Sequence, residues 1–154
     1  MASSTSIDFT EKEKKQYIVV KIGEEQYGID ISFIDNIVKM CKITRIPKVQ
    51  EYFKGIINLR GEIVPVMSIR TKMGLENDEY TKTTRIIILK LEAGMIGIVV
   101  DAVKEVVALS EEEIDRTAQS SKSNANFING IGKNGEELIS LLELSAVVDP
   151  SILA

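Results

Sequence analysis

Short apolar runs recur along this chain from residue 16 to residue 142, and turns that contain glycine or charged residues separate them. The runs are five to seven residues long and rich in Val and Ile, which is typical of β-strands. They pair across short turns and predict four β hairpins: 16–22 with 26–31, 56–60 with 63–69, 85–91 with 95–100, and 127–132 with 138–142.

Glycine and proline add local detail to this pattern. Gly61 and Gly135 supply the permissive backbone that the turns of the second and fourth hairpins need. Pro65 has no N–H to donate, so we expect its strand at a sheet edge or with that position facing outward.

Two segments between the first and second hairpins are less regular. Residues 33–38 fit a short turn and a bulged strand equally well. Residues 48–54 follow Pro47 and predict one helical turn that ends at Gly55.

The chain also repeats itself internally. When residues 18–38 are placed on residues 87–107, every apolar position of the first segment meets an apolar position in the second. The segment that begins at Phe53 resembles the one that begins at Phe127 at a slightly larger shift. The same order of hairpins therefore occurs twice.

The repeat predicts two similar β units within one domain spanning residues 16–150. We expect them at approximately 16–84 and 85–150, intertwined, with each sheet closed so that its edges are hidden. Units of this size have marginal cores, so they should pack on each other. The groove between them is the natural place for a binding partner.

Charge and composition narrow the classes of partner. The chain has 154 residues and a net charge of −4, which argues against nucleic acid and anionic lipid, although it leaves room for a local basic patch. Residues 1–15 are small, polar and charged, and predict a flexible tail. Residues 85–89 are the strongest apolar run and are too short to span a bilayer, so we expect a cytoplasmic protein without direct membrane insertion.

Candidate catalytic groups are few. There is no histidine and only one cysteine, Cys41, which excludes histidine chemistry and a multi-cysteine zinc site. Residues 130–135 match G-x-G-x-x-G, but they lie in a predicted hairpin and not in a βαβ unit, so they predict a turn. Asp101 lies among apolar residues, where burial would raise the pKa of its carboxyl group. We expect no enzyme activity, no cofactor and no metal ion.

Arg60 is the most informative polar residue, because it ends an apolar strand directly before Gly61. A guanidinium group there can reach across a groove and form several charge-assisted hydrogen bonds with a partner. An arginine that packs its aliphatic part at a strand end and keeps its charge in water explains the position equally well.

A longer motif surrounds Arg60, running Phe53-Lys-Gly55-Ile-Ile-Asn-Leu-Arg60-Gly61-Glu-Ile-Val-Pro-Val66. This segment resembles the CheW family of bacterial chemotaxis adaptors. The resemblance extends over nearly the whole chain, because other segments stand in the family's order and spacing: 27–31, 44–47, 98–101 and 128–132.

The resemblance implies a mainly β fold of two SH3-like, five-stranded β barrels packed around a shared core, with short helices. It also implies a non-catalytic adaptor that couples the cytoplasmic tips of chemoreceptors to the regulatory domain of a CheA-type histidine kinase. The receptor tip, a helical hairpin, would lie in the groove between the barrels, and the kinase would dock on a barrel end. The isolated chain is expected to be a monomer that joins its partners in membrane-associated receptor arrays.

Two binding surfaces follow when the resemblance is carried onto this chain. The kinase-facing end of the first barrel would include Ile43, Ile46, Pro47 and Gly55. The second barrel's kinase contact is left unassigned. The receptor groove would include six residues: Ile31, Ile34, Asn36, Arg60, Arg85 and Val106.

Three residues depart from the family pattern. Asn36 stands where a glutamate is common, and Arg85 stands where a β-branched residue is common; both changes affect the receptor's polar partners. Ser68 stands where an aspartate is usual, so the hydrogen bond that supports the following turn is expected to be weaker or replaced.

Two other interpretations stay open. The same fold would serve as a scaffold of another histidine-kinase pathway. A small ligand-binding β barrel is the alternative of a different class, and it would need a pocket with convergent polar groups.

Overall fold

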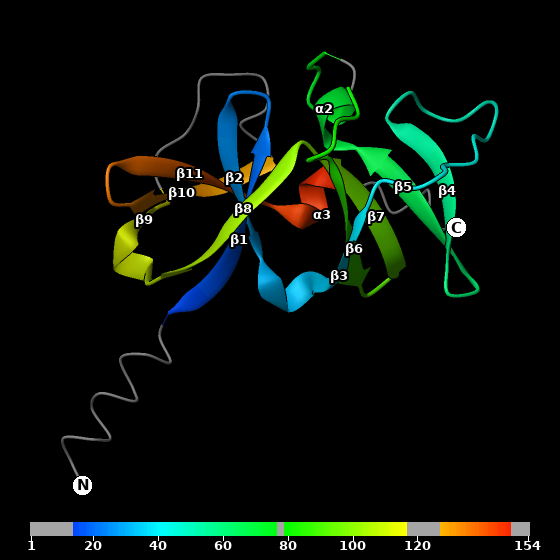
Figure 1. The fold of residues 1–154 in the computed structure, drawn as a ribbon. Helices are drawn as coiled ribbons and strands as arrows, with labels where there is room; N and C mark the ends of the chain where they lie inside the picture. The colour runs from blue at the N-terminus through cyan, green and yellow to red at the C-terminus, as the bar shows by residue number, and fades with distance from the viewer. Residues whose placement is uncertain (1–13, 77–78, 117–126, 149–154) are drawn as a thin grey trace, which may run out of the picture.

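The computed structural model describes residues 14–76, 79–116 and 127–148. Figure 1 shows two β-sheets side by side, one of six strands on the left and one of five strands on the right. The strands are β1 (Lys15–Ile22), β2 (Glu25–Asp30), β3 (Ile34–Lys39), β4 (Phe53–Leu59), β5 (Glu62–Ser68), β6 (Arg85–Leu91), β7 (Gly94–Val100), β8 (Ala102–Leu109), β9 (Ile114–Asp115), β10 (Ile128–Asn134) and β11 (Glu137–Leu142). The helical segments are η1 (Ile31–Phe33), α2 (Ile69–Lys72), η2 (Glu111–Glu113) and α3 (Leu144–Val147).

All four predicted hairpins are present as antiparallel pairs, namely β1 with β2, β4 with β5, β6 with β7, and β10 with β11. The β4–β5 and β10–β11 turns contain two residues each, so their backbone enters the left-handed region. Gly61 (φ 86°) and Gly135 (φ 67°) do so, as predicted. Arg60, the first residue of the β4–β5 turn, also does so with φ 54°, which is uncommon for a residue with a side chain.

The two copies of the repeat have the same order of elements but exchange strands between the sheets. Strands β1 to β5 and α2 correspond in order to β6, β7, β8, β10, β11 and α3. The five-stranded sheet has the order β3-β6-β7-β5-β4, and the six-stranded sheet has the order β8-β1-β2-β11-β10-β9. The first two strands of each copy therefore share a sheet with the last three strands of the other copy.

The expected division at residues 16–84 and 85–150 does not coincide with the two sheets. The five-stranded sheet is built between residues 34 and 100, and the six-stranded sheet takes residues 15–30 and 102–142 from the two ends of the chain. The reason is that a repeat in sequence fixes which residues form strands, whereas the open edges of each first hairpin are covered by strands of the other copy.

The expected tail of residues 1–15 also overlaps the first strand. Lys15 belongs to β1 and pairs with Leu109 of β8, so its backbone is held in the sheet. Residues 1–13 lie outside the described residues.

Apolar side chains form three cores, and strands buried on both faces connect them. In β6, Ile86 and Ile88 belong to a core within the five-stranded sheet, whereas Ile87 and Leu89 belong to a core shared by both sheets. Strand β1 alternates in the same way between the shared core and a core within the six-stranded sheet. This double burial explains why these strands read as continuous apolar runs. Helix α3 lies between the sheets in Figure 1 and adds Leu144 to the shared core.

Two local predictions are resolved by the strand pairing. Residues 33–38 contain both the short turn and the bulged strand. The turn is the end of η1, and β3 follows it with an irregular register against β6 between Ile34 and Asn36. The helical turn predicted over residues 48–54 is wrong, because β4 begins at Phe53 and Gly55 lies inside it. Antiparallel pairing with β5 extends this strand toward its N-terminal end.

Pro65 lies in β5, an interior strand of the five-stranded sheet, but Pro65 itself pairs with β4 only. The strand β5 pairs with β4 along its length, but its parallel pairing with β7 begins at Val66. The segment that contains Pro65 is therefore locally an edge, as the missing N–H requires.

We predict that fragments 1–84 and 85–154 do not fold separately, because each lacks the strands that complete its sheets. An equimolar mixture should recover β-sheet circular dichroism and a cooperative thermal transition. A fragment that unfolds cooperatively by itself would contradict the strand exchange.

Candidate functional site

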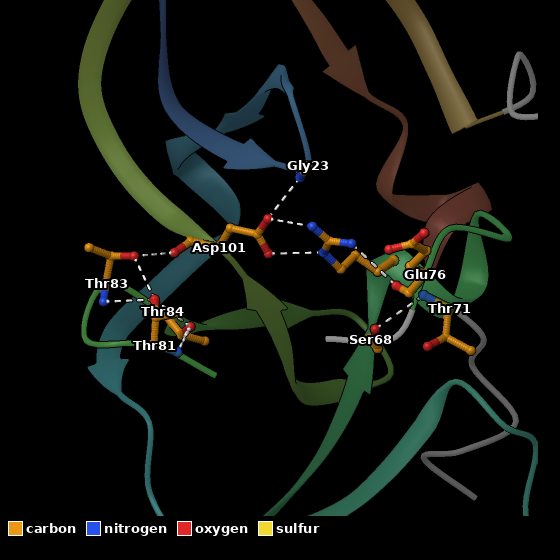
Figure 2. Close-up of polar contacts among 9 residues, drawn as sticks. Gly23, Ser68, Thr71, Glu76, Thr81, Thr83, Thr84 and Asp101 are labelled. Carbon is orange, nitrogen blue, oxygen red and sulfur yellow. Dashed lines mark hydrogen bonds and ion pairs between the residues drawn. The ribbon is translucent and has the colours of Figure 1, made fainter. Parts of the chain in front are cut away.

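Asp101 joins three parts of the chain at the junction between β7 and β8. The Arg70 guanidinium, on α2, donates from Nε to Oδ1 of Asp101 (3.1 Å) and from Nη2 to Oδ2 (2.9 Å). The N–H of Gly23, in the β1–β2 turn, donates to the same Oδ2 (2.8 Å), as Figure 2 shows. The Arg70 and Asp101 side chains are 19% and 26% exposed, so this bidentate ion pair is largely shielded from water.

The pKa of Asp101 is lowered, so the expectation of a raised value is wrong. Partial burial alone would raise this pKa, but the hydrogen bonds from Arg70 and Gly23 and the charge of Arg70 outweigh burial. A carboxylate held ionised by an arginine is a poor proton donor or acceptor at neutral pH. Asp101 is therefore a structural group that ties α2 and the five-stranded sheet to the first hairpin.

Ser68 performs the supporting role expected of its position. Its side chain is fully buried, and its Oγ accepts a hydrogen bond from the Thr71 N–H (3.1 Å), which caps α2 (Figure 2). A serine hydroxyl is a good N-cap, so the hydrogen bond that an aspartate would accept at this position is made by serine instead. This cap holds the turn from which Arg70 reaches Asp101.

Four of the six predicted groove residues lie on η1, β3 and β6. Ile31 in η1 and Ile34 at the start of β3 are half-buried against the shared core. Asn36 follows in β3, where its Oδ1 accepts a hydrogen bond from the Ile37 N–H (2.8 Å). Arg85 begins β6, and its Nη1 donates to the carbonyl groups of two residues before that strand, Lys82 and Thr84 (2.9 Å each).

The other two groove residues lie on β8 and in the β4–β5 turn. Val106 is 52% exposed on β8, an edge strand of the six-stranded sheet, opposite Ile18 of β1. Arg60 lies in the β4–β5 turn, and β4 is the edge of the five-stranded sheet opposite β3. Its side chain has no hydrogen-bond or ion-pair partner among residues 14–76, 79–116 and 127–148. None of the six residues lines either of the two hollows described next.

Three of the predicted kinase-facing residues come together in one hollow of about 790 Å³ between β3 and β4. Ile43, Ile46 and Pro47 line it together with Met40, Cys41, Arg45, Lys48, Val49, Gln50, Glu51, Phe53, Lys54 and Tyr80. We call this the basic hollow, because it contains three cations and one carboxylate. The net charge was compatible with a local basic patch, and the charges of residues 42–54 mark its place in the sequence.

Gly55 does not line the basic hollow but holds the segment that forms it. Thr44 and Ile56 exchange two backbone hydrogen bonds of 2.8 Å, which dock the segment after β3 onto β4. Gly55 has φ 139°, and a Cβ there would fall on the carbonyl group of Thr44. Glycine is required at this close approach of two backbones.

A second hollow of about 480 Å³ lies beside β1, the β6–β7 turn and α3. Its lining includes Tyr17, Phe33, Leu91 and Leu142, and charged side chains such as Glu143. No residue of the predicted surfaces lies in it.

Comparison with known proteins assigns the family. The model of the CheW-like domain matches residues 16–151. The chain belongs to the CheW-like domain family. It is 32% identical over 147 residues to the chemotaxis protein CheW of Helicobacter pylori, covering 96% of this chain and 89% of that protein. It is also 32% identical over 139 residues to the chemotaxis protein CheW of Bacillus subtilis, covering 90% and 89%.

A solved CheW structure has the same fold. The crystal structure of the scaffolding protein TtCheW from Thermoanaerobacter tengcongensis superposes with a TM-score of 0.81 at 34% identity, over 88% of each chain. The mainly β architecture of two packed units, identified from the resemblance and the repeat, is thereby confirmed.

Other chemical signals in this CheW-like chain have structural explanations. The G-x-G-x-x-G segment lies in the β10–β11 hairpin, as predicted. Within the described ranges, no cluster of three or more Cys, Asp and Glu side chains is arranged to hold a metal ion. The same ranges contain no helix long and apolar enough to cross a membrane. Arg70 was not among the predicted site residues, although its place shortly after the motif strand marks it as a candidate partner for Asp101.

We predict that Asp101→Asn lowers the free energy of unfolding by about 1–3 kcal/mol at neutral pH, because it leaves the shielded Arg70 without its counter-charge. Since the folded pKa of Asp101 lies below its ordinary value of 3.8, the pair stabilises the fold above that pH and its contribution fades as pH falls through the folded pKa. Urea unfolding from neutral pH to about pH 2 should therefore show a weaker acid dependence in the variant.

Glu111→Gln is the matched control for this experiment, because the Arg116–Glu111 pair (2.7 Å) is exposed to solvent. Its stability at neutral pH should stay close to that of the parent chain. Equal losses in the two variants would contradict the structural role of Asp101.

We predict that Gly55→Ala lowers stability by about 2–4 kcal/mol and loosens the basic hollow, because the added Cβ pushes the Thr44 backbone away from β4. Amide exchange at Thr44 and Ile56 should accelerate. Gly61→Ala is the control, since its Cβ would meet no atom within 4 Å despite φ 86°. It should cost less and leave these two amides protected.

Proposed function

We propose that this chain is a non-catalytic adaptor of chemotaxis that couples the cytoplasmic tips of chemoreceptors to a CheA-type histidine kinase. Membership of the CheW-like family over residues 16–151 carries this proposal. Relatives that match most of the chain are named chemotaxis proteins, and the similar solved structure is named a scaffolding protein. The adaptor would work in the cytoplasm and reach the membrane only through receptor contacts.

Arg60 is the proposed anchor for the receptor. Its backbone conformation (φ 54°) is one that an arginine adopts at a cost of about 1–2 kcal/mol. At the equivalent position of the β10–β11 turn stands Gly135 (φ 67°), for which a positive φ has little cost. A strained, exposed arginine without a partner among the described residues is poorly explained by folding and well explained by binding.

The groove would take an amphipathic helix of the receptor tip. Ile31, Ile34 and Val106 supply apolar surface around the junction of the sheets, and helix-in-groove recognition needs such a surface with a few polar anchors. Asn36 and Arg85 are the proposed polar neighbours. Each already makes a local hydrogen bond, which holds its side chain in place for a partner.

The basic hollow is the proposed docking surface for the kinase. Ile46 and Pro47 are exposed there, and Ile43 lies below them. Because this surface and the Arg60 turn are separate, receptor and kinase can be held at once. Contacts of micromolar strength suffice in an array, where neighbours supply a high effective concentration. Signals would pass as a shift between kinase conformations that the adaptor binds unequally.

We predict that Arg60→Asn keeps or slightly raises the thermal midpoint, because asparagine tolerates the left-handed turn conformation better than arginine. The same variant should bind receptor about 30-fold more weakly, the effect of losing a central arginine at an interface. Co-sedimentation with receptor-bearing membranes and kinase measures the binding.

Lys90→Asn serves as the control, since it removes an exposed cation elsewhere and should bind normally. An Arg60→Asn variant that unfolds would assign Arg60 to the fold. A stable variant that couples normally would exclude Arg60 from the receptor interface.

A further inference from the structure

Two cations face each other at one end of the pairing between β3 and β6. Lys39 and Arg85 are direct partners in the antiparallel register. Their Cβ atoms therefore lie about 5 Å apart, and like charges placed directly opposite in a sheet destabilise it. Neither side chain has an ion-pair partner among the described residues. We call these two residues the cation pair.

The cation pair continues the apolar face of the sheet that turns toward the shared core. Side chains alternate along β6, so Arg85 shares a face with Ile87 and Leu89, which both belong to that core. Opposite them on β3, Ile37 and Ile34 are partly buried against the same core. A helix that packs on Ile34 and Ile37 would therefore meet two cations at one end of its contact.

Arg85 is held in place with part of its guanidinium group unused. Its Nη1 donates to the carbonyl groups of Lys82 and Thr84 (2.9 Å each). The turn that carries these carbonyl groups is itself fixed, because the Thr83 hydroxyl donates to the Asp101 carbonyl (2.9 Å), as Figure 2 shows. Nε and Nη2 of Arg85 have no hydrogen-bond partner within the described ranges. This edge of a guanidinium group can bind a carboxylate through two parallel hydrogen bonds.

The acidic group that follows the neighbouring strand is already engaged. Asp101 comes directly after Val100, the β7 partner of Arg85, but its carboxylate accepts hydrogen bonds from Arg70 and from the Gly23 N–H. The described part of the fold therefore carries the repulsion of the cation pair without a compensating carboxylate. A carboxylate on a binding partner would remove this repulsion and use the free edge of the guanidinium group.

We propose that the cation pair binds one carboxylate side chain of the receptor helix that lies in the groove, and so selects receptor tips with an acidic residue at that place. This inference rests on the proposed adaptor function and adds Lys39 to the groove. Arg85 supplies the two directed hydrogen bonds, and Lys39 supplies a second charge. Because Lys39 is exposed, its contribution is screened by salt.

Co-sedimentation of the full chain with receptor-bearing membranes tests the proposal. Arg85→Gln should weaken binding about tenfold in about 50 mM salt, and Lys39→Gln about threefold, because each removes one charge from the contact. Both differences should shrink in about 500 mM salt. Lys90→Gln is the matched control, since it removes an exposed cation about 17 Å further along β6 and should bind as the parent chain does.

Charge reversal identifies the partner group. Lys39→Glu/Arg85→Glu should bind the receptor more weakly than either single variant, because two carboxylates would then repel the acidic residue. Acidic residues of the receptor tip are changed to lysine one at a time. One of these exchanges should restore binding to the reversed variant and weaken binding to the parent chain.

Stability separates a binding role from a folding role. Without receptor, Lys39→Gln should keep or raise the thermal midpoint, because it removes the repulsion between the two cations. A lowered midpoint would assign Lys39 to the fold and overturn the proposal. If Arg85→Gln does not fold, the binding of Lys39→Gln decides, since Lys39 makes none of the hydrogen bonds that hold the turn before β6.

Failure of this inference and failure of the adaptor function give different results. Receptor binding that neither single variant weakens, or a reversed variant that no exchange in the receptor rescues, would overturn the role of the cation pair and leave the adaptor function intact. A parent chain that does not bind the receptor would overturn the adaptor function, and this inference with it.

Discussion

The exchange of strands between the two copies of the repeat is the constraint on which the rest of the structure depends. Each first hairpin leaves open edges, and strands of the other copy cover them, so neither sheet can form without both halves of the chain. The exchange also places strands such as β1 and β6 with one face toward a sheet's own core and one face toward the shared core. Burial on both faces makes the two sheets one cooperative unit rather than two marginal ones.

The ion pair of Arg70 and Asp101 completes this unit at its polar junction. The carboxylate of Asp101, between β7 and β8, accepts hydrogen bonds from Arg70 after β5 and from the backbone of Gly23 in the β1–β2 turn. The pair is shielded enough that each member depends on the other, but it is not positioned to do acid–base chemistry. Asp101, whose pKa is lowered by this pair, thus serves the fold.

The proposed binding surfaces lie where the two copies of the repeat differ in sequence. Their inward positions are matched, because both must fill the same kind of core, whereas their surfaces have diverged. Arg60 stands where Gly135 stands in the other copy, and the basic segment of residues 40–54 stands where the other copy has the acidic residues 110–116. An approximately symmetric scaffold thereby carries surfaces of different chemistry, which suits the proposed binding of unlike partners.

The sequence by itself determined the hairpins, the turns at Gly61 and Gly135 and the repeat, because these depend on local alternation and backbone preference. The resemblance around Arg60 added the family. Strand partners were decided only by tertiary structure: edge pairing joins residues far apart in sequence, so the division at residue 84 did not match the sheets. The same holds for Asp101, whose pKa depends on Arg70 rather than on its apolar neighbours in sequence, and for Gly55, whose need to be glycine comes from the Thr44 backbone that crosses it.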